Sequence, residues 1–322
     1  MPYYLPEYAD SELRYGLLMD TVVRAHAKER SSALTASLAG RSALLYSALV
    51  VLTIISLFPF YWAFITSVKA DAELLAQPPR FLPTVWHWDN YLRSMRAEDF
   101  PRFFLNSFLV STVVCFVQIV LASTAGYAFA RLQFKGRDFL FALVLATLMV
   151  PFQVTMVPLF VMAKEWPLLG GNNILGQGGT GMLDSYWGLT IPALATAWGT
   201  FLLRQFFQSL PVELEDAARI DGCSEFGIYR RIILPQSAPA LATLGIFSFQ
   251  NVWNDFVWPF IIIKSDSMKT VQIGLLAVQR ENTTEWTLLM AATLVATIPV
   301  VIVFLLGQRY FTQGIALTGL KG

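Results

Sequence analysis

Six long stretches with almost no charged residues constrain the fold of this chain more than any other feature. The stretches lie at about 44–66, 104–130, 139–163, 185–205, 238–263 and 286–308. Each has close to or above the roughly 20 residues that an α-helix needs to cross about 30 Å of hydrocarbon. A continuous helix is the economical structure there, because every backbone amide is hydrogen-bonded within its own segment. The sequence therefore predicts an all-α integral membrane protein with six transmembrane helices.

The composition excludes several other classes of protein. Of the 322 residues, 55% are hydrophobic and 14% are charged, which lies outside the range of ordinary soluble domains. A formal net charge of +1 gives no reason to expect a nucleic-acid partner, since phosphate binding needs a clustered basic surface. The two cysteines, Cys115 and Cys223, support neither a disulfide framework nor a zinc site. No metal site is predicted.

The basic residues of the loops predict the orientation of the helices. The short loop after the second stretch holds Arg131, Lys135 and Arg137, and cytoplasmic loops carry an excess of Lys and Arg. We expect this loop on the cytoplasmic side, although the first external loop is also basic. The polar segment 210–235 then lies on the same side. Both termini are then also expected on the cytoplasmic side. The N-terminal segment is 1–43, the membrane domain is 44–309 and the C-terminal tail is 310–322.

The chain lacks the short motifs of hydrolytic enzymes. The glycine-rich stretch GGNNILGQGGTG begins at Gly170, but no Gly-Lys-Ser/Thr follows it, so it is interpreted as a flexible external loop. Neither His-Glu-x-x-His nor Gly-x-Ser-x-Gly occurs in the sequence. We therefore predict no catalytic residue and no cofactor bound by this chain.

The polar segment between the fourth and fifth stretches has the pattern of a short helix. In LPVELEDAARIDG, Pro211 suits the first turn and Gly222 suits a left-handed stop. A second helical piece is predicted to begin at Ser224 and to end near Pro235. The segment forms either a compact helical projection or a helix lying on the membrane surface. One face of the first helix is predicted to hold Leu214, Ala217, Ala218 and Asp221.

Within this segment, small, acidic and apolar residues follow a fixed spacing. The pattern is Asp216, Ala217 and Ala218, then three residues, Gly222, then nine residues, and finally Ile232, Leu234 and Pro235. This spacing resembles the EAA loop of bacterial ABC importer permeases. Asp216 stands where that family usually has Glu, and Glu215 precedes it.

The resemblance extends from about Leu44 to the C-terminus. It includes NSFLVST at Asn106, GYAFARLQFKGR at Gly126, MVPFQVTMVPLF at Met149, FLLRQFFQSLP at Phe201, WNDFVWPF at Trp253 and the tail QRYFTQGIALTGLKG. These stretches resemble the binding-protein-dependent sugar importers, and are most similar to the second permease subunit of maltose-type systems. The first forty residues match nothing in that family.

The resemblance implies a set of partners and a location. In such importers two permease subunits pair, two ATPase subunits bind ATP and Mg beneath them, and an external binding protein delivers the sugar. The resemblance thus implies a heterodimer in the cytoplasmic (inner) membrane of a bacterium or archaeon. It implies that the EAA loop forms a coupling helix seated in an ATPase subunit, with the tail also at the ATPase. The residues so implicated are Glu215, Asp216, Ala217, Ala218, Asp221, Gly222, Ile232, Leu234, Pro235, Lys321 and Gly322.

The fifth stretch carries polar residues that a lipid-facing surface disfavours. These residues fall on one helical stripe, which we expect to face the bundle interior or a water-filled cavity. Two interpretations stay open: the stripe lines the translocation path or meets the partner permease, or it only packs the bundle through hydrogen bonds. Trp253 and Trp258 have the shape to stack on a sugar, or they anchor the helix at the membrane interface. The stripe consists of Ser248, Asn251, Asn254, Asp255 and Trp258.

Three other functions compete with that of a sugar importer. Importers of glycerol phosphate or its diesters belong to the same branch and are not distinguished by this sequence. An ion-driven secondary transporter would show ionisable residues at mid-membrane and a repeat of half the chain, whereas the sequence shows Asp255 and no clear repeat. An intramembrane enzyme would need paired catalytic groups within the apolar stretches, and none is visible in the sequence.

Overall fold

A computed structural model describes residues 42, 44–97, 99–279 and 285–319 of the chain. The predicted N-terminal segment 1–43 and the tail residues Lys321 and Gly322 therefore lie almost wholly outside the described residues. The chain divides into two compact units, one ending at Trp62 and one beginning at Ala63. The described part of the first unit belongs to the helix Leu44–Ser67, whose large apolar side chains are exposed as lipid-facing side chains are.

The second unit is helical throughout its described residues, and no strand occurs among them. Two 3₁₀ turns, η1 (Ile191–Ala193) and η3 (Asp266–Met268), and a π-helical turn (Tyr229–Ile233) interrupt the α-helices. The α-helices are α2 (Asp71–Leu74), α3 (Asp89–Ala97), α4 (Phe100–Arg131), α5 (Arg137–Thr147), α6 (Phe152–Lys164), α7 (Tyr186–Thr190), α8 (Ala197–Ser209), α9 (Glu213–Ile220), α10 (Glu225–Ile228), α11 (Leu234–Gln236), α12 (Ala238–Trp253), α13 (Val257–Ile262), α14 (Val271–Val278) and α15 (Trp286–Gly319).

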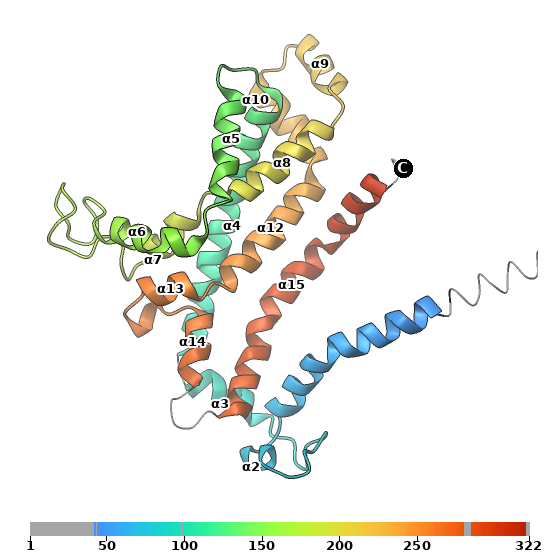
Figure 1. Ribbon diagram of the computed structural model, residues 1–322, viewed down its shortest axis with the longest axis vertical. Coiled ribbons are helices and arrows are strands. Elements are labelled where there is room, and N and C mark those ends of the chain that lie inside the picture. The colour runs from blue at the N-terminus through green and yellow to red at the C-terminus, as the bar shows by residue number, and fades with distance from the viewer. Residues whose placement is uncertain (1–41, 43, 98, 280–284, 320–322) are drawn as a thin grey trace, which may run out of the picture. The chain divides into compact units, whose positions relative to one another are not determined.

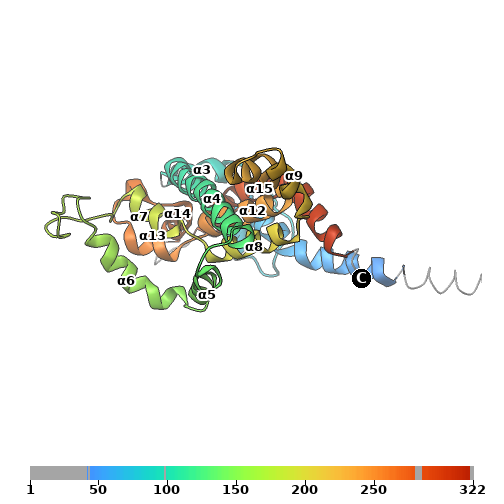
Figure 2. The ribbon, with the colours of Figure 1, turned by 90° about the horizontal axis from the view of Figure 1, so that it is seen from above.

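Helix α4 is the element against which the second unit packs. It runs for 32 residues and lies beside α8 and α12 (Figures 1 and 2). Gly126 allows the approach of α8, because a Cβ added there would stand 3.1 Å from the backbone nitrogen of Arg204. Small residues at such a crossing let two helix backbones come close, which is how helices associate within lipid.

The predicted spans are not all continuous helices. Among the described residues, three helices are long and apolar enough to cross a membrane, and two bent pairs raise the number to five if each pair is one span. The stretch 139–163 is not straight: it bends by 98° between α5 and α6, in the region where Pro151 and Pro158 suggest a kink. Pro151 accounts for the break: it is the extended residue before α6 and disfavours helical backbone at the residue preceding it.

Two further stretches are also divided. The stretch 185–205 is α7, the turn η1 and α8, with a break before Thr196, which caps α8. The stretch 238–263 is interrupted after Trp253, between α12 and α13. The prediction of single continuous helices is wrong for both, and the number of membrane crossings stays a prediction.

The glycine-rich loop after α6 is held by a dense set of hydrogen bonds, so its interpretation as a flexible loop is wrong. The buried amide of Asn172 donates to the carbonyls of Lys164 and Trp166 and accepts from Gly179 N at 2.7 Å. A Cβ on Gly179 would lie 2.2 Å from the carbonyl oxygen of Gly170. Here glycine serves close backbone packing instead of flexibility.

Gly126→Val tests the close packing of α4 on α8. The added side chain meets backbone atoms at 3.1 Å, so the helices must separate, which costs about 1–3 kcal/mol of stability as overpacking does. We expect a lower melting temperature of the purified protein in detergent, measured by fluorescence-detected size exclusion after heating. Gly245→Ala is the matched control, because the nearest atom there is a side-chain carbon at 3.4 Å. Equal melting temperatures for both variants would contradict close helix packing at Gly126.

Candidate coupling segment and translocation cavity

The polar segment folds as a helix, a glycine stop and a second helix. Helix α9 ends before Gly222, whose φ of +77° is the left-handed stop that the sequence predicts. The hydroxyl of Ser224 accepts a hydrogen bond from the backbone of Gly227 and so begins the second helical piece. That piece continues through the π-helical turn and α11, and bends by 77° into α12 after Gln236. Both predicted boundaries of the second piece are confirmed.

Helix α9 presents two different faces. Glu215 and Ala218 are buried against the rest of the chain, whereas Asp216 and Ala217 are exposed. The prediction that Ala218 shares one face with Leu214 and Ala217 is therefore wrong, because Ala218 alone of the three packs in a core with residues of α4 and α8. The remaining residues of the EAA-like pattern are exposed or half-buried: Asp221, Gly222, Ile232, Leu234 and Pro235.

The outer face of this segment carries exposed apolar side chains on a polar background. Ile220 is 87% exposed and Leu214 is 41% exposed on α9, and Phe226 is 66% exposed on α10. Apolar side chains exposed outside the hydrocarbon region can contribute to an interaction surface where they lie close together. The face is suited to contact another protein.

The inner face of α9 is held by ion pairs. Glu215 Oε1 lies 2.8 Å from Nε of Arg131 at the end of α4, and Glu215 Oε2 lies 3.4 Å from Arg219. Burial raises the pKa of the Glu215 carboxyl, while Arg131 and Arg219 oppose this effect. Arg219 also pairs with Asp216 and Glu225, both at 3.0 Å. The hydrogen bond from Arg219 lowers the pKa of Glu225, so the Glu225 carboxylate stays charged at neutral pH.

Two hydroxyl contacts continue the attachment along α4. Tyr127 donates to Glu225 at 2.9 Å, and the hydroxyls of Ser123 and Tyr229 lie 2.7 Å apart. Ser123, Tyr127 and Arg131 are four residues apart, so they form one polar stripe along the last turns of α4. Sequence reasoning missed this stripe, although its spacing in an otherwise apolar stretch was a visible signal.

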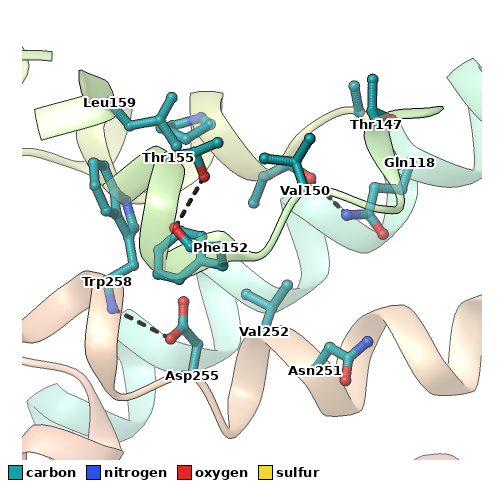
Figure 3. A pocket seen from close by; sticks show the side chains of 13 residues that line it. Gln118, Thr147, Val150, Phe152, Thr155, Leu159, Asn251, Val252, Asp255 and Trp258 are labelled. Carbon is teal, nitrogen blue, oxygen red and sulfur yellow. Dashed lines mark hydrogen bonds between the residues drawn. The ribbon is translucent and has the colours of Figure 1, made fainter. Parts of the chain in front are cut away.

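A cavity of about 670 Å³ lies where three helix breaks meet (Figure 3). Its wall comes from α4, from the bend between α5 and α6, from the turn before α8 and from the break between α12 and α13. Non-helical backbone at membrane depth is tolerated where it is buried in protein or lines a water-filled cavity. The residues that line the cavity are Gln118, Thr147, Val150, Phe152, Thr155, Leu159, Pro192, Ala193, Ala195, Asn251, Val252, Asp255 and Trp258.

The cavity contains only part of the stripe predicted on the fifth stretch. Asn251, Asp255 and Trp258 line it, whereas Ser248 is buried elsewhere in α12 and Asn254 accepts a hydrogen bond from Gln272. The prediction of one helical stripe is wrong, because α12 ends at Trp253 and the residues beyond it no longer follow the helical period.

The two tryptophans of this region are packed. The indole of Trp253 is 1% exposed and donates to the carbonyl of Ala296. The indole of Trp258 is 4% exposed and donates to Gly188, and the Trp258 backbone nitrogen donates to Asp255. The Trp253 ring is thus unavailable for stacking on a sugar. The aromatic ring that the cavity does expose is Phe152, which sequence reasoning missed.

Gln118 and Thr155 were also missed as cavity residues. Gln118 is a polar side chain within the apolar stretch of α4, and its amide donates to the carbonyl of Ala193 at 2.5 Å. Thr155 donates to the carbonyl of Phe152 at the start of α6. A polar residue in an apolar stretch was the signal in each case. The sequence alone gave no means of placing either residue beside Asp255.

Comparison with known proteins identifies the family. Residues 118–317 match the model for the binding-protein-dependent transport system inner membrane component. The chain belongs to this family. It is a permease subunit of an ABC importer, and the resemblance recognised in its sequence is confirmed.

Two curated relatives cover most of this permease. It is 34% identical to the arabinooligosaccharides transport system permease protein AraQ of Halalkalibacterium halodurans, over 83% of this chain and 92% of the relative. It is 33% identical to the sn-glycerol-3-phosphate transport system permease protein UgpE of Yersinia pestis bv. Antiqua, over 83% of this chain and 93% of the relative.

The fold is shared with a solved ABC importer. A chain from the crystal structure of a bacterial ABC transporter involved in the import of the acidic polysaccharide alginate matches the permease with a TM-score of 0.70. The two chains are 20% identical, and the match covers 97% of this chain and 100% of the other. The predicted all-α permease fold is confirmed.

Gly222→Val tests the stop at the end of α9. A residue other than glycine in the left-handed conformation costs about 1–2 kcal/mol, so the stop should distort and ATP-driven transport should fall. The space around Gly222 is open, so the effect comes from backbone conformation alone. Gly222→Asn is the matched control, because Asn adopts this conformation more readily than other residues with a side chain. Uptake by the reconstituted importer measures both, and equal rates for Val and Asn would exclude a role for the left-handed stop.

Proposed function

We propose that this permease forms half of the transmembrane path for a neutral oligosaccharide or disaccharide. The cavity at the three helix breaks is the main support for this function. Its wall combines an exposed aromatic ring with amide, hydroxyl and carboxylate groups, which suits a ligand that has both apolar faces and hydroxyl groups. The arabinooligosaccharide permease among its relatives supports the same class of substrate.

The charge of the cavity argues against the glycerol phosphates. Asp255 is an acid, and none of the described residues that line the cavity is Lys, Arg or His. A phosphate group beside Asp255 would be repelled and would find no cation there, and like charges close together in a low dielectric raise the energy. A neutral sugar meets no such repulsion. Because a glycerol-3-phosphate permease is among the relatives, import of glycerol phosphate is included as an outcome of the test below.

The exposed face of α9 and α10 supports a role in coupling. We infer that Leu214, Ile220 and Phe226 seat in an ATPase subunit, with Asp216, Ala217 and Asp221 around them. The ATPase subunits bind ATP and Mg, while this chain binds no nucleotide and carries no catalytic residue. The segment and both termini then lie on the cytoplasmic side, with Lys321 and Gly322 also reaching the ATPase.

The complete importer contains further subunits in this proposal. A second, different permease supplies the other half of the path, two ATPase subunits bind beneath the pair, and an external binding protein delivers the substrate. The family is defined by dependence on a binding protein, which supports the last of these partners.

Reconstitution of the complete importer in proteoliposomes tests the substrate class. With the cognate binding protein outside and ATP inside, we expect uptake of arabinotriose or maltotriose and no uptake of glycerol 3-phosphate. Liposomes that hold the two permeases without ATPase subunits are the control, and they should neither hydrolyse ATP nor accumulate sugar. ATP-driven uptake of glycerol 3-phosphate without uptake of either oligosaccharide would overturn the proposal.

Asn251→Ala tests whether the cavity is the path. Removing an amide that bonds a bound hydroxyl costs about 1–3 kcal/mol, so uptake at low substrate concentration should fall by roughly fivefold or more. Asn254→Ala is the matched control, because Asn254 directly follows the end of α12 but lies outside the cavity. We expect that control to change uptake far less. Equal effects of the two substitutions would contradict a path through this cavity.

A further inference from the structure

Glu215 is the one acidic side chain that is buried among the described residues of this permease, at 1% exposure. A buried carboxylate is costly unless it is paired, and the removal of one partner of a buried pair leaves an uncompensated charge. Glu215 has two partners, Arg131 and Arg219. Arg219 is shared with Asp216 and Glu225 on the exposed side of the segment, so Arg131 is the partner that faces the membrane domain.

Arg131 joins three elements at one point. Its Nε lies 2.8 Å from Glu215 of α9, its Nη2 donates to the carbonyl of Leu210 at 2.7 Å, and the residue itself ends α4. Leu210 directly follows α8 and is its C-cap residue. A displacement of α9 therefore acts directly on the ends of α4 and α8.

Helix α4 connects this point to the cavity without a break. Gln118, which lines the cavity, stands 13 residues before Arg131 on the same helix, a separation of about 20 Å at 1.5 Å per residue. Helix α8 also runs unbroken from Leu210 to the turn that lines the cavity, whereas two other routes contain sharp bends. Helix α12 meets the polar segment at a 77° bend, and α5 and α6 meet each other at 98°.

The ion pair is reinforced along the same helix. Glu225 accepts from Tyr127, and Tyr229 contacts Ser123, so the segment is attached to three successive turns of α4. Figure 1 shows α9 and α10 at the end of α4 from which α5 continues.

We propose that the Arg131–Glu215 ion pair is a clasp through which movement of α9 is passed to α4, and through α4 to the cavity wall at Gln118. Arg131 and Glu215 are positioning residues in this role, since neither touches the substrate. The inference rests on the proposed coupling function of the polar segment. Glu215 then connects α9 to α4 inside the permease, whereas the neighbouring Asp216 is exposed on the surface.

The test uses the complete reconstituted importer and two single variants, Glu215→Gln and Arg131→Gln. We expect both to retain the ATPase subunits on purification and to continue hydrolysing ATP. The sugar transported per ATP, and the stimulation of ATP hydrolysis by the loaded binding protein, should fall by about tenfold, a typical strength of coupling between two sites. Glu213→Gln is the matched control: it removes an exposed acid from the first turn of the same helix and should leave the ratio unchanged.

A charge exchange separates a clasp from a merely structural pair. The triple variant Arg131→Glu, Glu215→Arg and Arg219→Gln reverses the ion pair without placing the new arginine beside Arg219. We expect it to regain transport per ATP relative to the variant that carries only Glu215→Arg and Arg219→Gln. An unchanged ratio in assembled Glu215→Gln importer would overturn the inference. If the single variants fail to assemble, the charge exchange is the test. The inference is overturned if the exchange restores assembly but not the sugar transported per ATP. It is also overturned if the exchange restores neither.

The same experiment distinguishes this inference from the proposed function. If the unmodified importer takes up no oligosaccharide with ATP, the proposed function fails. If the unmodified importer transports the oligosaccharide and Glu215→Gln transports as much per ATP, only the clasp fails.

Discussion

Every backbone amide and carbonyl within hydrocarbon needs a hydrogen-bond partner, and this requirement governs the rest of the structure. Helix α4 meets it alone, as one uninterrupted helix. In the broken helices around α4, side chains supply part of the missing hydrogen bonds. Gln118 donates to the carbonyl of Ala193, and the indole of Trp258 donates to the carbonyl of Gly188. The breaks are tolerated because α4 and a few polar side chains complete the bonds that the helices lose. The cavity exists at the position where those breaks meet.

The polar segment depends on the same helix in a different way. Outside the hydrocarbon, α9 is too short to be stable by itself, since isolated helices shorter than about 12–15 residues are marginal in water. Its acidic inner face is held by Arg131, and its outer face remains free for another protein. One helix thus supports both the segment that we propose to contact the ATPase and the wall of the cavity. This arrangement gives a permease without a nucleotide site of its own a direct mechanical connection between the two.

Several features of the fold and the site could be predicted because they depend on local sequence. The stop at Gly222 and the helix start at Ser224 follow from the conformational freedom of glycine and the capping hydroxyl of serine, and both are confirmed. The spacing from Asp216 to Pro235 was enough to indicate the family, because it lies within one segment. The prediction of a polar stripe on the fifth stretch was wrong beyond Trp253, because counting by helical period assumes an unbroken helix. The prediction for Ala218 was wrong for another reason: adjacent residues of a helix point about 100° apart, so the edge of the buried face passes between Ala217 and Ala218.

The sequence by itself determined the apolar stretches, the polar segment between the fourth and fifth of them and the family to which the chain belongs. These follow from hydropathy and from residue spacing within single segments, which need no knowledge of neighbouring helices. Only the tertiary structure decided that Glu215 pairs with Arg131, 84 residues earlier in the numbering, and that Gln118 shares a cavity with Asn251 and Asp255. Those contacts depend on where each helix breaks and how far it is rotated about its axis. Both are set by the packing of side chains between helices, which no single segment contains.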